Sequence, residues 1–393
     1  MGRTRLKRLK IEAAVVARLS GVLLLSGALG VDVARGETCT TQSQMKPAER
    51  DAIARTAQEL AGKVATNDAA GLRTRTIPEY TKDFSGMASL IGSTSPKVKG
   101  APLSVDQVYL LDASSLKTLG DGTNQDAQFF CSLNQSIAEA NFMIPSLPPG
   151  RYGFAIVTAS TPKAPWRMSF LVRQDAEATA GDAGGHWSMA GFYPKALTAA
   201  GRDGIWYWTQ ARDLVKQKQL WTAYLYYSQA QTLLQPVGFL TSTHLDKLRK
   251  EAVASAPPAL SEGISGDAPL VVKGQHGADY RFTELTTDDS LGADKIDIVV
   301  HLQAEPATEP PSPSDAKANK AAKADTKSDT GKGDAEKAAP SAAVSPGDRN
   351  NNAMAALLAA YPELRTNFHG VWVFAETPGK SPFVTEQPMA NIH

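Results

Sequence analysis

Hydrophobic and polar residues alternate along this chain with two different periods, which divide it into helical and extended regions. Apolar residues recur every three or four positions between 53 and 64, so one amphipathic helix is predicted, with Pro47 at its start. A second helical segment is predicted from 78 to 91. Residues 93–102 carry two prolines and a glycine and are predicted to form a loop, whereas the polar residues 37–46 are predicted to form a mobile leader.

The period changes to two after residue 104, which predicts a series of strands. They are expected at 105–111, 128–133, 151–157, 166–173 and 186–193. Trp166, Met168, Phe170 and Val172 alternate with more polar residues, as in an antiparallel strand that buries one face. Helices followed by antiparallel strands predict an α+β fold.

The order of these elements and the sequence GHWSMAGFYPK at 185–195 resemble a nuclear-transport-factor-2-like (cystatin-like) domain over residues 47–197. The resemblance implies an N-terminal helix in the concave face of a curved antiparallel sheet, often with a cone-shaped pocket. An immunoglobulin-like sandwich is the alternative, because the Pro-Gly-Arg-Tyr turn at 149–152 is common there. The long first helix argues against that alternative.

Four residues could project into such a pocket, namely Tyr80, Asp83, Asp106 and His186. A buried Asp or His could act there as a general base with a shifted pKa. The alternative is that Tyr80 and Asp83 lie on the solvated side of a helix and that His186 caps a strand.

Residues 201–256 are predicted to form a helical segment, with a hairpin at 204–215 and 220–234 and a third helix at 243–254. The hairpin resembles one tetratricopeptide repeat, because large and small packing residues recur at its spacing: Tyr207, Ala211, Leu214, Ala223, Tyr227, Ala230 and Pro236. There is no second copy, so the hairpin must pack on a neighbouring element.

The hairpin carries more aromatic residues than one buried stripe requires. Trp206, Trp208, Trp221 and Tyr224 are therefore candidate anchors for a protein or peptide partner, since interface hot spots favour Trp and Tyr. Core packing is the alternative explanation for the same residues.

The C-terminal region is predicted to be one small α+β unit, built from 264–304 and 349–393. Strands are expected at 270–272, 280–285, 296–302 and 370–375, with a helix that Asn351 or Asn352 caps and that ends at Ala360. The strand at 370–375 should pair with 296–302 and be covered on both faces, because Val371 and Val373 alternate with Trp372 and Phe374.

Residues 305–348 interrupt this unit. They contain no aromatic residue, Leu, Ile or Met, so they cannot bury enough apolar surface to offset the entropy of ordering. A disordered insertion is therefore predicted, and its length adds little to the cost of closing the loop.

Residues 1–36 are predicted to be a secretory signal peptide. Basic residues come first, an apolar core follows at 19–31, and small residues stand at 34 and 36. The core is shorter than the roughly 20 residues that span a bilayer, and no later apolar run reaches that length. The mature protein is therefore expected in the periplasm or outside the cell, without a membrane span.

The net charge argues against a nucleic-acid partner. The whole chain has a formal charge of +1, and residues 1–36 carry seven Lys or Arg and two acids, which leaves the mature protein near −4. Nucleic-acid binding requires clustered surplus Lys and Arg.

Two cysteines, Cys39 and Cys131, could pair in an oxidising compartment. A buried free thiol is the alternative for Cys131, which follows two phenylalanines. The six histidines are scattered, so neither a metal nor another cofactor is expected. These features favour an exported, non-enzymatic binding or interaction protein, with a small-molecule binder or an enzyme that uses the N-terminal pocket as the alternative.

The predicted signal peptide should be removed on export. Intact-mass measurement of envelope fractions is expected to give a mature chain that begins near Glu37, because small residues stand at the two positions that signal peptidase reads. A full-length product confined to the cytoplasm would contradict this prediction.

Overall fold

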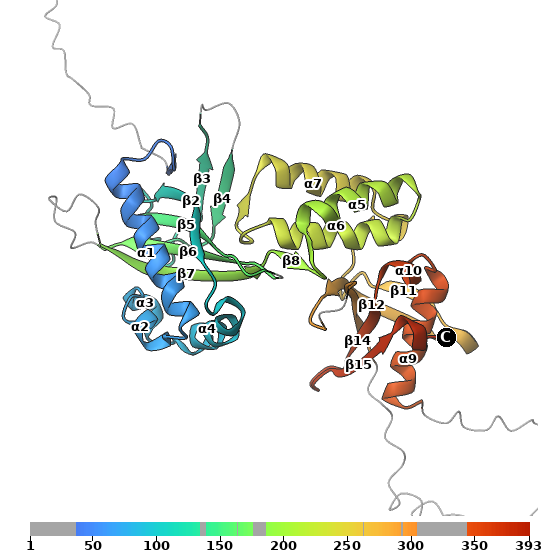
Figure 1. Cartoon of the computed structure of the whole chain (residues 1–393). Helices are drawn as coiled ribbons and strands as arrows, with labels where there is room; N and C mark the ends of the chain where they lie inside the picture. The colour runs from blue at the N-terminus through green and yellow to red at the C-terminus, as the bar shows by residue number, and fades with distance from the viewer. Residues whose placement is uncertain are drawn as a thin grey trace, which may run out of the picture. The chain divides into compact units, whose positions relative to one another are not determined.

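The α+β structure contains two five-stranded sheets, and three helices separate them in the sequence (Figure 1). The computed structural model describes residues 37–133, 139–162, 164–175, 186–261, 263–291, 294–304 and 344–393. The predicted signal peptide, residues 1–36, and residues 305–343 of the predicted insertion lie outside these ranges.

The first sheet is antiparallel throughout, with the strand order β1-β2-β5-β6-β7. Its strands are β1 (Thr38–Thr41), β2 (Leu103–Asp112), β5 (Arg151–Ala159), β6 (Trp166–Gln174) and β7 (Trp187–Ala196). The predicted strands at 166–173 and 186–193 are confirmed to within three residues at each end.

Helix α1 (Pro47–Ala65) packs across one face of this sheet (Figure 1). Its buried stripe includes Ile53, Leu60 and Val64. Gly153 of β5 permits the close approach, because a Cβ at that position would lie 2.7 Å from Cγ2 of Ile53.

Three shorter helices follow α1. One of them includes residues 93–98, so the predicted loop at 93–102 is wrong over that part. They are α2 (Ala69–Arg73), α3 (Pro78–Thr81) and α4 (Ser85–Val98). Helix α4 continues through Pro96, because Ile91, Ser95 and Val98 face the core and their burial outweighs the local preference of proline.

The predicted mobile leader at 37–46 is also wrong. Residues Thr38–Thr41 form β1, which pairs with β2 and places Cys39 opposite Leu111. Nothing in the period of these residues indicates a strand, so pairing with the rest of the sheet imposes the extended conformation.

The opposite face of the first sheet is covered by a small sheet of order β10-β4-β3. Its strands are β3 (Ala127–Cys131), β4 (Ala140–Ile144) and β10 (Leu240–Thr241). Tyr109, Phe142 and Phe154 pack edge to face between the two sheets, with ring centroids 5.1–5.3 Å apart. The first sheet is thus buried on both faces.

A short hairpin, β8 (Thr198–Ala199) and β9 (Arg202–Asp203), leads into the helical segment. The predicted helices are present as α5 (Gly204–Lys216), α6 (Leu220–Leu234) and α7 (Thr243–Ala254). Asp203 caps α5 and Ser242 caps α7. Their side chains accept hydrogen bonds from the backbone N–H groups of Trp206 and Leu245, respectively.

The second sheet has the order β11-β12-β13-β14-β15, and only the β13–β14 pair is parallel. Its strands are β11 (Leu270–Lys273), β12 (Asp279–Asp288), β13 (Asp297–Gln303), β14 (Gly370–Glu376) and β15 (Phe383–Pro388). The predicted pairing of 370–375 with 296–302 is confirmed.

Helix α9 (Pro346–Ala360), with α10 (Leu364–Asn367) after it, packs on one face of this sheet. Helix α9 begins before Asn351, the predicted cap, and Ser345 caps it instead, with its Oγ accepting from the Asp348 N–H at 3.1 Å. The predicted disordered segment, 305–348, therefore extends too far, because α9 already begins at Pro346. Asn350 lies inside the helix, fully buried, and donates to the Phe383 carbonyl at 3.2 Å.

Strand β14 is buried on only one face, contrary to the prediction. Val371 and Val373 are fully buried against α9, whereas Trp372 and Phe374 on the other face are half-buried. The described residues also include three 3₁₀ turns, at Pro258–Leu260, Gln275–Gly277 and Met389–Asn391.

Truncation of Leu357 on α9 should destabilise the second sheet. Leu357 has no exposed surface and belongs to the core that α9 shares with β13 and β14, so Leu357→Ala is expected to cost about 2 to 5 kcal/mol. Thermal and denaturant unfolding would measure the loss, and hydrogen exchange should accelerate at Val300 and Val373.

Val253→Ala is the matched control, because Val253 is 73% exposed and the change should stay within about 0.5 kcal/mol. Equal effects of the two substitutions would show that α9 does not hold the sheet.

Candidate functional site

Two of the four predicted pocket residues line one small hollow. Tyr80 and Asp83, from α3 and the turn after it, lie with Phe84 and Met87 opposite Met189 of β7, around a space of about 210 Å³. Tyr80 is half-exposed to solvent, so the hollow is a surface feature beside the sheet.

The chemistry of Asp83 does not suit a general base. Its carboxylate accepts hydrogen bonds from Ser85 Oγ at 2.7 Å and from the Ser85 N–H at 3.3 Å. These bonds lower the pKa of Asp83, because they stabilise the charged form. A base active near neutral pH requires a raised carboxyl pKa instead.

The other two predicted pocket residues lie elsewhere. Asp106 is exposed on β2 and accepts hydrogen bonds from Ser104 and Thr158. His186 precedes β7, is largely exposed, and lies 3.5 Å from the Asp175 carboxylate. The structure therefore does not bring the four residues into one pocket.

The aromatic side chains of the helical hairpin pack inside the protein. Trp208 and Trp221 are only 8% and 9% exposed, so the prediction that they are exposed anchors is wrong. Trp206 and Tyr224 are half-buried against the same core. Trp221 stacks on Tyr361 with ring centroids 3.8 Å apart.

A charged pair completes the packing around Trp208. The guanidinium of Arg212 lies 4.4 Å from the centroid of the Trp208 ring and forms two hydrogen bonds to Glu251, at 2.7 and 3.0 Å. Trp208 Nε1 donates to the same carboxylate at 2.8 Å. The hydrogen bond from Arg212 lowers the pKa of Glu251, which marks a stable structural ion pair.

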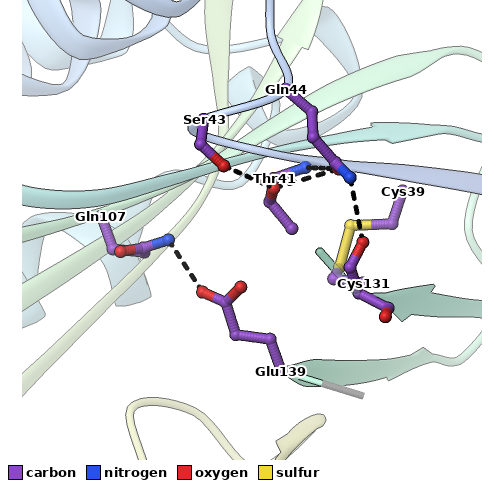
Figure 2. The surroundings of a disulfide bond; sticks show 8 residues. Cys39, Thr41, Ser43, Gln44, Gln107, Cys131 and Glu139 are labelled. Atoms are coloured by element: carbon purple, nitrogen blue, oxygen red, sulfur yellow. Dashed lines mark hydrogen bonds between the residues drawn. A yellow bond between two sulfur atoms is a disulfide. The ribbon is translucent and has the colours of Figure 1, made fainter. Parts of the chain in front are cut away.

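A disulfide joins β1 to β3 through Cys39 and Cys131, whose Cα atoms are 5.0 Å apart (Figure 2). Gln44 adds hydrogen bonds from Nε2 to the carbonyls of Ser132 and Leu133, both at 3.1 Å. The end of β3 is therefore fixed to the first sheet by one covalent bond and two hydrogen bonds.

The β3–β4 hairpin presents apolar side chains to solvent on its outer face. Phe129, Cys131 and Phe142 point inward and are fully buried. Phe130 and Met143 alternate with them, so they point outward, and each is 59% exposed.

Leu133, just beyond β3, is equally exposed. We call Phe130, Leu133 and Met143 the hairpin patch. Sequence analysis misses this patch, because the Phe-Phe-Cys run at 129–131 is typical of a core strand and no strand is predicted at 140–144.

No metal site is found in the described ranges, where no three His, Cys, Asp or Glu side chains are placed to hold an ion. Within the same ranges, no helix is long and apolar enough to cross a bilayer.

Comparison with known proteins gives no relative: no family model, no curated protein and no solved structure matches this chain.

Loss of the disulfide should destabilise the protein. The bond closes a loop across a sequence separation of 92 residues, so Cys39→Ser/Cys131→Ser is expected to cost about 4 to 5 kcal/mol by chain entropy. Urea unfolding of the variant and of the oxidised wild type measures the difference. Reduction of the wild type should reproduce the loss, and an unchanged unfolding midpoint would contradict the prediction.

Proposed function

We propose that this chain is an exported, non-enzymatic interaction protein that binds a partner protein through the hairpin patch. The observation that carries the proposal is the patch itself: three large apolar side chains, each 59% exposed, on a hairpin whose first strand a disulfide joins to the first sheet. Apolar groups gathered on a rigid surface are typical of protein interfaces.

The disulfide also supports export, since such bonds persist in oxidising compartments. Residues 1–36 supply the signal peptide in this proposal, and the mature protein acts in the periplasm or outside the cell. An antiparallel sheet with α1 on one face supports the resemblance to nuclear-transport-factor-2-like domains, and the α5–α6 hairpin supports the resemblance to a tetratricopeptide repeat.

The alternative is a small-molecule binder that uses the hollow beside Tyr80 and Asp83. The observation in its favour is the lining, which combines apolar Phe84, Met87 and Met189 with the polar groups of Thr76 and Asp83. A ligand in this hollow would protect the half-buried Met87 from oxidation and leave Met143 reactive. A partner on the hairpin patch would protect Met143 instead.

Photo-cross-linking in the source cells tests the proposed interface. The photoreactive analogue p-benzoyl-phenylalanine replaces Phe130 or Met143 in turn, and a discrete adduct of the same partner is expected from both positions. Position 253 is the matched control, because Val253 is an apolar residue exposed on α7, away from the hairpin patch. No adduct from either hairpin position, or the same adducts from all three, would overturn the proposal.

A further inference from the structure

The face of the second sheet that points away from α9 carries a second surface of different chemistry. Its side chains follow from the strand registers: Glu284, His301, Phe374 and Val384 form one row, and Thr286, Val299, Trp372 and Glu386 form the next. We call these two rows the outer face.

Aromatic rings occupy the centre of the outer face. His301 stacks on Phe374 with ring centroids 5.2 Å apart and an interplanar angle of 12°. Trp372 lies beside Phe374 at 6.4 Å and 19°. All three side chains are only half-buried, so ring surface remains open to a ligand.

Carboxylates surround these rings. Glu376 Oε1 lies 2.6 Å from Nδ1 of His301, and Glu284 Oε2 lies 3.8 Å from Nε2, so the imidazole holds a carboxylate on each side. Both glutamates keep about half of their side-chain surface exposed, at 48% and 53%. Glu386 faces Trp372 across the ladder, and Asp288 lines the hollow next to it.

Arg281 borders this acidic surface. It lies at the corner next to Gln303 and donates to its side-chain oxygen at 3.3 Å. Among the described residues named here, four carboxylates outnumber this guanidinium, so the outer face favours cations.

Two hollows meet at His301. One of about 570 Å³ is lined by Glu284, His301 and Glu376, and the other, of about 300 Å³, by Asp288, His301 and Trp372 among others. The indole Nε1 of Trp372 is buried and has no hydrogen-bond partner in the part of the chain that the structure describes.

We propose that the outer face binds an extended segment of a partner protein that carries Lys or Arg side chains. The carboxylates pair with the cationic groups, and the faces of Trp372 and Phe374 hold ammonium or guanidinium by cation–π attraction. Several cationic side chains on one extended peptide can pair with the carboxylates together, which a single free cation cannot do. The proposal is independent of the hairpin patch, because the two surfaces share no residue.

A lysine peptide on the full mature chain tests the proposal. In an extended strand alternate side chains point the same way, so a fluorescein-labelled (Lys-Ala)₅ peptide can direct all of its lysines at the sheet. Fluorescence anisotropy at low ionic strength should show saturable binding, and the (Glu-Ala)₅ peptide should not bind.

Paired substitutions assign the binding to the outer face. Glu284→Gln/Glu376→Gln removes two charges without changing side-chain shape and is expected to weaken binding about tenfold. Glu59→Gln/Asp213→Asn removes two charges from exposed carboxylates on α1 and α5, and binding should stay within about twofold.

Trp372→Leu keeps apolar bulk but removes one of the two aromatic faces, and it should weaken binding of the peptide about threefold or more. Thermal unfolding confirms that each variant is folded. The proposal is overturned if the wild type does not bind (Lys-Ala)₅, if both charge variants bind alike, or if free lysine competes as well as the peptide on a molar basis.

Discussion

The parallel pairing of β13 with β14 determines the arrangement of the C-terminal part of the chain. A parallel neighbour cannot be reached by a tight turn, so the chain has to leave the sheet and return at the other end. In this protein the connection contains α9, whose apolar residues cover one face of the sheet. Because side chains alternate along both strands, the same pairing directs Val300 and Val373 toward α9 and leaves His301 and Phe374 on the opposite face. The outer face is therefore a direct consequence of the crossover.

The helical hairpin depends on contacts at both ends of its second helix, α6. The side-chain oxygen of Glu363 accepts from the Trp221 N–H at 2.6 Å, where α6 begins and backbone donors lack partners inside the helix. At the other end Arg167 and Lys195 donate to the last carbonyls of α6, at 3.1–3.4 Å. Burial lowers the pKa of Lys195, but the helix C-terminus is a favourable place for its positive charge. A single hairpin can thus be stable without further repeats, because neighbouring segments satisfy both ends of α6.

Sequence patterns predicted the elements whose signals are local. Helix α7 has the predicted bounds, because polar residues precede its apolar stripe and Pro257 and Pro258 follow it, although Ser242 and not the expected Thr243 is its cap. The elements that were missed depend on distant residues. Strand β1 is imposed by pairing with β2 and by the bond to Cys131, and α4 passes Pro96 because its buried face continues. For the candidate sites, the excess of aromatic residues in the hairpin is compatible with core packing or with exposed anchors, and no pattern could reveal that Trp221 would pack on Tyr361, which follows it by 140 positions.

Unspecific association is limited in different ways at the hairpin patch and at the outer face. The hairpin patch is small and is held in a fixed position, so it exposes a few apolar side chains without a charge among them. The outer face holds more ring surface, and an exposed apolar face of that kind would invite other apolar surfaces to associate. Glu284, Glu376 and Glu386 oppose this, because an apolar partner would have to desolvate carboxylates that it could not pair. A cationic partner pairs them instead, so the same charges that protect the surface select what binds to it.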